Sequence, residues 1–206
     1  MKIVGLAGGL ASGKDTVAEL FAERGIKAVD ADIISRELTA DGSPAVIDIV
    51  ARFGEGITKE NGGIDRAKLR DLVFHNKQEL DWLEKFLHPL IRDRIKQEVQ
   101  QLATASNNVY CLLIAPLLLE TGLYKMCDKI IVIDVLMEQQ VQRAQLRDQA
   151  TGMTQDIATK IIKRQLPQDD KLKLADHILD NSGDVSHLKH QVEELHQQLI
   201  NNFQAS

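Results

Sequence analysis

GGLASGKDT, residues Gly8–Thr16, stands between an apolar run, Lys2–Ala7, and a helical pattern over Asp15–Arg24. The stretch matches the phosphate-binding loop GxxxxGK[ST] up to its last position. Glycines let successive backbone amides point at one anion, the helix N-terminus adds its dipole, and Lys14 reaches the outer phosphates. A glycine-rich turn that only opens a helix is the plain alternative, and the lysine, the spacing and the strand-to-helix context favour a nucleotide site. The candidate binding residues are Gly8, Gly9, Ala11, Ser12, Gly13, Lys14, Asp15 and Thr16.

Asp15 is a departure from this motif, which usually has at that position a hydroxyl that binds magnesium. A carboxylate is a hard ligand that suits Mg²⁺, so Asp15 is a candidate metal ligand. An acidic residue in the first helical turn is also favourable to the helix dipole without any metal. Both interpretations stay open.

The composition is that of an ordinary globular protein. The 206 residues are 44% hydrophobic and 27% charged, which removes support for a disordered or fibrous chain. The formal net charge of -5 argues against a broad basic surface for nucleic acid or anionic membrane. If the protein handles anions, it must do so locally.

Cysteine usage and apolar runs bear on location. Cys111 and Cys127 have neither the spacing of a metal site nor the number of a disulfide framework, which favours a reducing cytoplasm. The amino terminus shows no charged leader with a cleavage site. The longest apolar stretch, Val109–Leu119, is shorter than the ~20 residues that a membrane span needs. We therefore expect a cytoplasmic protein that contacts neither membrane nor nucleic acid.

Apolar runs alternate with helical patterns along the chain. Further strands are expected at Lys27–Asp32, Val109–Ala115 and Lys129–Val135, with a weaker strand at Ile178–Leu179. The runs at 109–115 and 129–135 are apolar on both faces, as in strands at the middle of a parallel sheet. The alternation predicts an α/β fold whose parallel sheet is flanked by helices.

Capping residues locate several helices. Ser43 before Pro44 is typical of an N-cap followed by proline at the first helical position. Asn76 and Glu79 have the spacing of a capping box at the start of a long helix, in which Pro89 must cause a kink or a division. Three more helices are expected, at Glu138–Gln149, Thr154–Gln165 and Val185–Ile200.

Two carboxylates come at the end of the second expected strand. In open α/β sheets the carboxyl ends of the strands face the ligand crevice, so Asp30 and Asp32 can approach both phosphate and acceptor. The strand period of two places both side chains on one face. Helix capping is the alternative for one of them.

At this point an ordered set of residues resembles the dephospho-CoA kinase family over essentially the whole chain. The set comprises Gly8–Thr16, Asp30-Ala31-Asp32 with Arg36, Phe74, His88-Pro89-Leu90-Ile91, Pro116-Leu117-Leu118 with Glu120, Arg143 through Arg147-Asp148, Arg164-Gln165, and Ala175-Asp176 through Asp180-Asn181. The resemblance implies transfer of the γ-phosphoryl group of ATP, with Mg²⁺, to the ribose 3′-hydroxyl of dephospho-CoA. It also implies a P-loop kinase core at about 1–40, 106–137 and 166–206, a helical CoA-binding insertion at about 41–105 and a helical lid at about 138–165.

The resemblance assigns roles to several residues. Asp32 is the expected general base or acceptor-orienting group, and Asp30 supports its loop. Arg143 and Arg147, four residues apart on one helix, and Lys14 bring positive charge to the transferring phosphoryl group; by themselves, helical arginines are more often solvated. Arg164 is a further lid candidate. The expected acceptor-binding residues are Asp32, Arg36, His88, Pro116 and Leu117, and Asn181 is expected beside the adenine of ATP.

For several of these residues a structural role is the alternative. His88 is by itself a capping or packing histidine beside Pro89. Glu120 is equally a helix-start residue, and turn chemistry alone accounts for Asn181.

Two other functions compete with this one. A different nucleoside or nucleotide monophosphate kinase would share the loop, the lid and the core, and the acceptor it uses would distinguish it. A nucleotide-dependent switch protein would hydrolyse its nucleotide slowly and without stimulation by an acceptor. The arginine-bearing lid favours a phosphoryl-transfer enzyme over a switch protein.

Overall fold

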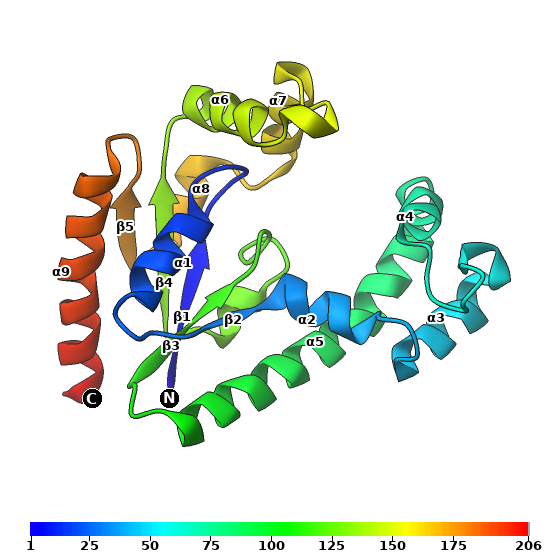
Figure 1. Cartoon of the computed structure of the whole chain (residues 1–206), viewed down its shortest axis with the longest axis horizontal. Helices are drawn as coiled ribbons and strands as arrows, with labels where there is room; N and C mark the ends of the chain where they lie inside the picture. Colours follow the sequence, from blue (N-terminus) through cyan, green and yellow to red (C-terminus); the bar gives the residue numbers. More distant parts are fainter. Residues whose placement is uncertain (206) are drawn as a thin grey trace. The chain divides into compact units, whose positions relative to one another are not determined.

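The computed structural model describes residues 1–205, which form two compact units (Figure 1). The first unit comprises Met1–Asp30 and the chain from Val99 onward, and the second comprises Ala31–Glu98. No helix among the described residues is long and apolar enough to cross a bilayer. The second unit overlaps the expected insertion at 41–105 with different bounds, and the division into core, insertion and lid stays a prediction.

A parallel sheet forms the centre of the first unit (Figure 1). Its strands are β1 (Lys2–Ala7), β2 (Ala28–Asp30), β3 (Tyr110–Ile114), β4 (Lys129–Asp134) and β5 (His177–Asp180). The order across the sheet is β2-β3-β1-β4-β5, and every neighbouring pair is parallel. The predicted α/β fold with a parallel sheet is confirmed, and the carboxyl ends of all these strands lie along one edge.

Burial of the strands follows their apolar sequence. Every residue of β3 is buried, and so are the central residues of β4. On one face of the sheet, α1 (Lys14–Ala22) and α9 (Val185–Gln204) share a continuous core with the strands. Gly5 of β1 faces the other way, where an added Cβ would lie 2.8 Å from both Cys127 Sγ and Leu118 Cδ2. The segment that follows β3 therefore covers the second face closely at this point.

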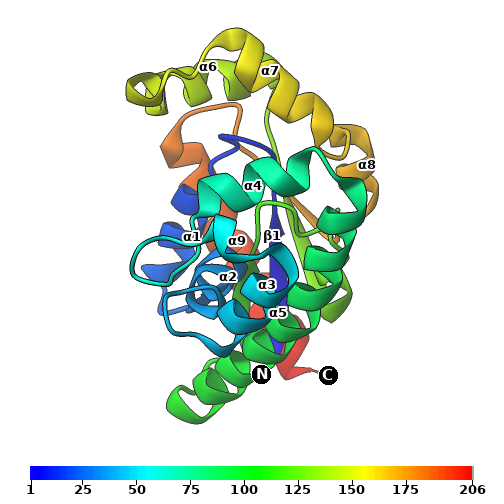
Figure 2. The ribbon, with the colours of Figure 1, turned by 90° about the vertical axis from the view of Figure 1, so that its right-hand side faces the viewer.

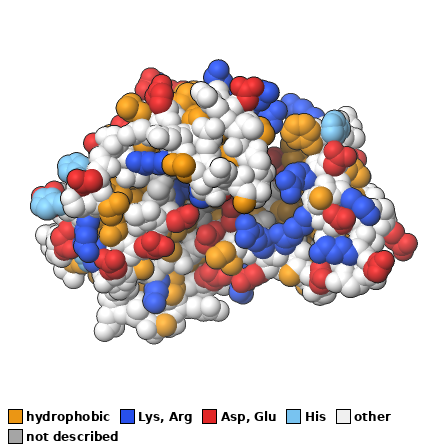
Figure 3. Space-filling view, turned by 45° about the horizontal axis from the view of Figure 1, so that its top comes forward, with side chains coloured by type: hydrophobic (Ala, Val, Ile, Leu, Met, Phe, Trp, Pro, Cys, Tyr) orange, Lys and Arg blue, Asp and Glu red, His pale blue; other side chains and the backbone are white. Residues whose placement is uncertain are grey.

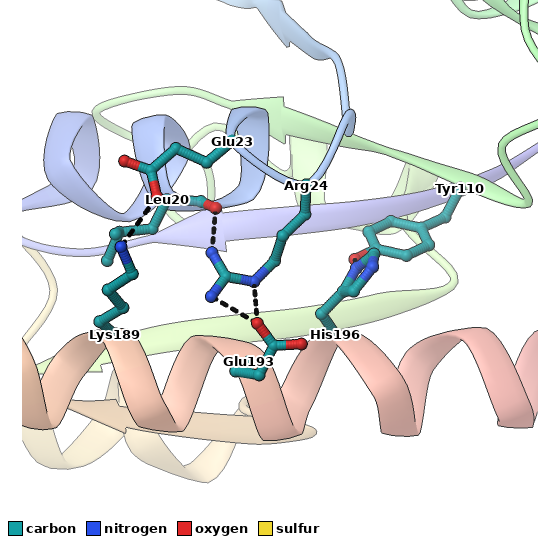
Figure 4. Close-up of polar contacts among 7 residues, drawn as sticks. All are labelled: Leu20, Glu23, Arg24, Tyr110, Lys189, Glu193 and His196. Carbon is teal, nitrogen blue, oxygen red and sulfur yellow. Dashed lines mark hydrogen bonds and ion pairs between the residues drawn. The ribbon is translucent and has the colours of Figure 1, made fainter.

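Polar contacts join α9 to the base of this core (Figure 4). The Tyr110 hydroxyl and His196 Nδ1 lie 2.7 Å apart, and burial lowers the pKa of His196. On the same helix, Glu193 Oε2 accepts a hydrogen bond of 2.7 Å from Arg24 Nε at the end of α1. Beside this hydrogen bond, Lys189 of α9 forms an ion pair with Glu23. These contacts fix α9 to α1 and to the start of β3.

Three helices lie between β4 and β5 (Figure 1): α6 (Met137–Arg147), α7 (Gln155–Arg164) and α8 (Gln168–Lys173). A 3₁₀ turn, η3 (Gln149–Thr151), links α6 to α7, and Thr154 caps α7 by accepting from Ile157 N. A small apolar cluster, built on Val141, Ala144 and Ala158, holds α6 and α7 together, and Leu10 of the glycine-rich loop packs against it. The two predicted polar helices are present, and Leu10 joins them to the glycine-rich loop through an apolar contact.

The second unit is helical. It contains α2 (Ala31–Leu38), α3 (Pro44–Phe53), η1 (Glu55–Ile57), α4 (Arg66–Phe74) and most of α5 (Lys77–Ala105). Figure 2 shows α4 above α2 and α3 within this unit. The core of the unit consists of Val46, Ile49, Ile57, Ile64, Leu69 and Val73. These residues come from α3, η1, the segment before α4, and α4, and partly buried apolar residues of α5 pack against them.

Some local expectations for helix boundaries need correction. Pro89 lies inside α5, which continues on both sides of it, so the prediction that the helix divides there is wrong. Pro89 is exposed, and water can therefore bind the backbone carbonyl group that the proline ring leaves without a hydrogen bond. Ser43 does precede α3, but its hydroxyl donates to Leu38 O instead of capping the helix. The side chain of Asn76 accepts hydrogen bonds from the backbone N of Gln78 and from that of Glu79. The N-cap predicted at Asn76 is therefore confirmed.

The second strand is shorter than expected. β2 ends at Asp30, and α2 begins at Ala31, so Asp32 lies in the first turn of a helix. The prediction that strand periodicity places Asp30 and Asp32 on one face is therefore wrong. Only three residues pair with β3, and the backbone turns into a helix immediately afterwards.

Candidate active site

The glycine-rich loop occupies the carboxyl end of β1 and opens α1 (Figure 1). Gly13 is the residue before the helix and has φ of 97°, in the left-handed region that favours glycine. Ala11 also has positive φ, at 51°. The first amides of α1 lack intrahelical partners, so the loop and the helix start present backbone donors at one place.

Lys14 brings its positive charge back over this loop. Its Nζ donates to Gly8 O at 2.8 Å and to Gly9 O at 2.9 Å. The ammonium group therefore bridges two consecutive carbonyls at the end of β1, next to the amides of the loop. This arrangement is suited to an anionic group with several oxygens.

Asn181 supports the loop from below. It is 7% exposed, and its Nδ2 donates to Ser12 O at 2.7 Å. The side chain occupies the space that a Cβ at Gly13 would need. Its own carbonyl accepts from Arg143 Nη2 at 2.9 Å. Asn181 is thus a buried link between the phosphate loop and α6, a role that turn chemistry did not predict.

The two arginines on α6 have different partners. Arg143 is bound to the carbonyl of Asn181, whereas Arg147 donates to both carboxylate oxygens of Asp148, at 2.9 and 2.7 Å. The hydrogen bond with Asp148 raises the pKa of Arg147, and Asp15 is a further negative charge that acts on it. The same bond lowers the pKa of Asp148. Arg147 therefore stays charged and is exposed, in reach of solvent anions.

Two glutamines beside the loop are absent from the predicted site residues. Gln165 Oε1 accepts from Leu10 N at 3.0 Å, and Gln140, 4% exposed, lies against Gly9. Within the described residues, Gln140 Oε1 is a buried oxygen without a hydrogen bond. The only sequence signal was Gln165 itself, in the pair Arg164-Gln165.

Comparison with known proteins identifies the family of the chain. The family model for dephospho-CoA kinase matches residues 2–187. The chain belongs to the dephospho-CoA kinase family. A relative named dephospho-CoA kinase from Shewanella oneidensis is 42% identical over 198 residues, covering 96% of this chain and 93% of the relative. One from Yersinia pestis is 40% identical over the same shares of the two chains.

Solved structures agree with the family assignment. Dephospho-CoA kinase from Campylobacter jejuni has a TM-score of 0.72 and 27% identity, covering 98% of this chain and 99% of that one. The structure titled TT1252 from Thermus thermophilus has a TM-score of 0.80 and 26% identity over 96% and 97% of the two chains. The predictions of the family, of a P-loop kinase fold and of a phosphotransferase are confirmed: this member of the dephospho-CoA kinase family is a kinase.

The loop after β3 emerges beside the phosphate loop at the edge of the sheet. β1 and β3 are paired in parallel, so their carboxyl ends emerge side by side. Pro116 and Leu117 follow β3 and are both exposed. Asp30, at the end of β2, borders β3 on its other side. The structure therefore brings the expected acceptor residues of the first unit to the edge that carries the phosphate loop.

The remaining acceptor candidates of this dephospho-CoA kinase family member lie in the second unit. Asp32 and Arg36 are both exposed on α2, four residues apart and thus on the same face of the helix. His88 is half-buried on α5, one residue before Pro89. Arg164, the further lid candidate, is exposed at the end of α7.

Charged side chains of both signs are interspersed on the face drawn in Figure 3. This distribution agrees with the formal net charge of -5 and with local recognition of anions. Among the described residues, no group of three or more His, Cys, Asp or Glu side chains could hold a metal ion. Asp15 is an exposed carboxylate in the first turn of α1, beside the loop. Mg²⁺ in nucleotide sites commonly takes one or two protein carboxylates and completes its shell with phosphates and water, so this donor set fits that ion.

Proposed function

We propose that the chain transfers the γ-phosphoryl group of ATP to the ribose 3′-hydroxyl of dephospho-CoA, which gives coenzyme A and ADP, the last step of coenzyme A biosynthesis. The new bond joins the ribose oxygen to the γ-phosphorus, and the bond from that phosphorus to the β,γ-bridging oxygen breaks. The observation that carries the proposal is the phosphate loop closed by Lys14, in a chain that matches its family over residues 2–187.

The loop residues bind the nucleotide in this proposal. Backbone amides at Gly8–Thr16 and the dipole of α1 hold phosphate oxygens, and Lys14 exchanges the carbonyls of Gly8 and Gly9 for the outer phosphates. Asn181 keeps the loop in shape through Ser12 and lies near the adenine. Because the loop is already formed, little backbone ordering accompanies binding.

Asp32 is the proposed group that accepts the proton of the ribose hydroxyl, and Arg36, His88, Pro116 and Leu117 are the proposed acceptor contacts. Phosphoryl transfer needs little covalent help from protein, so a base adds only about 10²-fold to 10⁴-fold, and positioning with charge neutralisation supplies the rest. Arg143 and Arg147 supply positive charge to the transferring group; Arg147 must exchange Asp148 for phosphate to do so.

Asp15 is the proposed ligand for Mg²⁺. When bound, this ion would neutralise phosphate oxygens and help to orient them. Without it, the Asp15 carboxylate faces the phosphates as a like charge, which makes nucleotide binding depend on the metal.

We place the reaction in the cytoplasm. Both Cys111 and Cys127 are free thiols, which suits a reducing compartment. Burial raises the pKa of Cys111 to about 11 and that of Cys127 to about 12, so both stay protonated at neutral pH. They serve as small apolar residues, not as ligands.

The decisive experiment measures ADP release with each of several acceptors. Dephospho-CoA should stimulate release strongly, and AMP, dTMP and adenosine should not; preference for one of these would point to another monophosphate or nucleoside kinase. Slow release that no acceptor stimulates would point to a switch protein. Asp32→Asn should lower kcat by about 10²-fold or more, and Asp48→Asn, a matched exposed change on α3, should leave kcat unchanged.

A further inference from the structure

The chain between α7 and α8 is bound to the carboxyl edge of the sheet. This stretch, residues 165–168, is hereafter the crossing segment. Leu166 N donates at 2.9 Å to Glu120 Oε1, in the loop after β3. Gln168 Nε2 donates at 3.1 Å to Ile133 O, in β4. β1 lies between β3 and β4 in the sheet, so the crossing segment is fixed on both sides of the strand that leads into the phosphate loop.

Gln165, the first residue of the crossing segment, binds the phosphate loop itself. Its Oε1 accepts from Leu10 N at 3.0 Å. Its backbone N donates to Ile162 O, so the end of α7 holds the residue on one side, and the bond of Leu166 N holds it on the other. Since the acceptor oxygen stands on a fixed backbone, Gln165 determines where the amide of Leu10 lies.

The close approach of two glutamines explains the glycine that precedes Leu10. The φ angle of Gly9 lies outside the left-handed region, so backbone freedom does not require glycine there. An added Cβ would lie 2.8 Å from Gln140 Oε1 and 3.1 Å from Gln165 Oε1. Gln140 is 4% exposed near the start of α6, and its Nε2 donates to Val135 O. Gly9 thus lies against two amide oxygens, one from each end of the α6–α7 pair.

The residue after Leu10 depends on support from outside the loop. Ala11 has φ of 51°, a left-handed conformation that is unfavourable for alanine. Leu10 and Ala11 both pack against the apolar cluster of α6 and α7. The outer arm of the phosphate loop, residues 9–11, is therefore held by this apolar contact and by the hydrogen bond to Gln165.

We propose that Gln165 is a positioning residue for ATP, which holds the outer arm of the phosphate loop in the conformation that binds the nucleotide, and that Gln140 supports this arm from the other side of Gly9. The proposal rests on the proposed function, because it concerns the ATP site of the kinase. Both glutamines act through the backbone of the loop and not on the reacting atoms. Loss of Gln165 should therefore weaken the binding of ATP and leave that of dephospho-CoA nearly unchanged.

The test compares Gln165→Met with the unaltered enzyme. Methionine has a similar length but places a methyl group where the amide oxygen accepts from Leu10 N. The Kd for ATP, measured by titration without acceptor, should rise about tenfold, and so should the KM for ATP. The kcat at saturating ATP and the KM for dephospho-CoA should stay within about twofold. Gln142→Met, the same change at an exposed position of α6, is the matched control and should leave all four constants unchanged.

The exchange rate of the Leu10 amide hydrogen, followed by NMR, tests the contact without any ligand. Gln165→Met should raise this rate by about tenfold or more. The Val17 amide, which donates to Gly13 O at the start of α1, should exchange as before, whereas a general loss of structure would raise both rates. An unchanged rate at Leu10, an equal rise at both amides, or an unchanged Kd for ATP would each overturn the proposal.

Gly9→Ala tests the same contact from the side of the loop. The added Cβ must displace the oxygens of Gln140 and Gln165, so this change should also raise the Kd for ATP. Adding Gln165→Met to Gly9→Ala should then raise the Kd by less than Gln165→Met does alone. Fold-changes that simply multiply in the double variant would overturn the proposal. If Gln165→Met does not fold, Gln165→Asn, which withdraws the oxygen by one methylene, must show the same selective loss of ATP affinity.

Failure of the proposed function gives a different result. An unaltered enzyme that dephospho-CoA does not stimulate refutes the function. The titration with ATP and the exchange rate at Leu10 need no acceptor, so they decide the role of Gln165 in either case.

Discussion

Replacement of Gly13 by alanine tests the construction of the phosphate loop. Gly13 has φ of 97°, and an added Cβ would meet the Asn181 amide that donates to Ser12 O at 2.7 Å. The left-handed backbone costs an alanine about 1–2 kcal/mol, and the displaced buried hydrogen bond costs about 1–3 kcal/mol more. We therefore expect Gly13→Ala to lower the free energy of unfolding by about 2–5 kcal/mol.

Gly25→Ala is the matched control for this change. Gly25 also has positive φ, at 80°, but nothing lies within 4 Å of an added Cβ, so only the backbone term of about 1–2 kcal/mol applies. Urea denaturation of the two variants, together with titration by ATP, separates the terms: Gly13→Ala should also lose most nucleotide affinity, and Gly25→Ala should keep it. Equal stabilities of the two variants, or normal ATP binding by Gly13→Ala, would refute the reasoning about Asn181.

Three further predictions concern charge. Asp15→Ser should make ATP binding less dependent on Mg²⁺, as measured by titration with and without EDTA; an unchanged dependence removes Asp15 from the metal site. Arg147→Ala should lower kcat by about 10²-fold and shift Tm little, because its pair with Asp148 is exposed; full kcat would remove it from the mechanism. Burial holds the pKa of His196 below its value in the unfolded chain, so the unfolded state gains the proton first and stability should fall as pH drops below about 6.5. In His196→Gln, Tm should therefore depend less on pH between pH 7 and about pH 5.5. An unchanged dependence of Tm on pH would assign the effect to other groups, such as His177.

The central strands were predictable because their sequences leave no alternative. The runs at 110–114 and 130–133 are apolar at every position, so both faces of each strand must be buried, and the middle of a parallel sheet offers this. The phosphate loop was equally predictable, since its glycines and lysine act through local backbone geometry. The structure confirms both inferences.

Features that depend on distant contacts were not predictable. β2 pairs with β3 through only three residues, which is too few to show a period, so the sequence predicts a strand at Asp32 although this residue lies in the first turn of a helix. Asn181 looked like a turn residue because its partner, Ser12, is far away in sequence. Lys171 stands in a polar helix that any periodicity would place in solvent, and only the packing of α8 against β4 buries it.

The most direct test of the proposed activity is the identity of the phosphorylated product. The enzyme is incubated with ATP, Mg²⁺ and dephospho-CoA, and the product is analysed by mass spectrometry and phosphorus NMR. The proposal predicts one added phosphoryl group, on the ribose 3′-oxygen, in an amount equal to the ADP released and greatly reduced with Asp32→Asn. ADP release without a phosphorylated acceptor, or a phosphoryl group at another position, would contradict it.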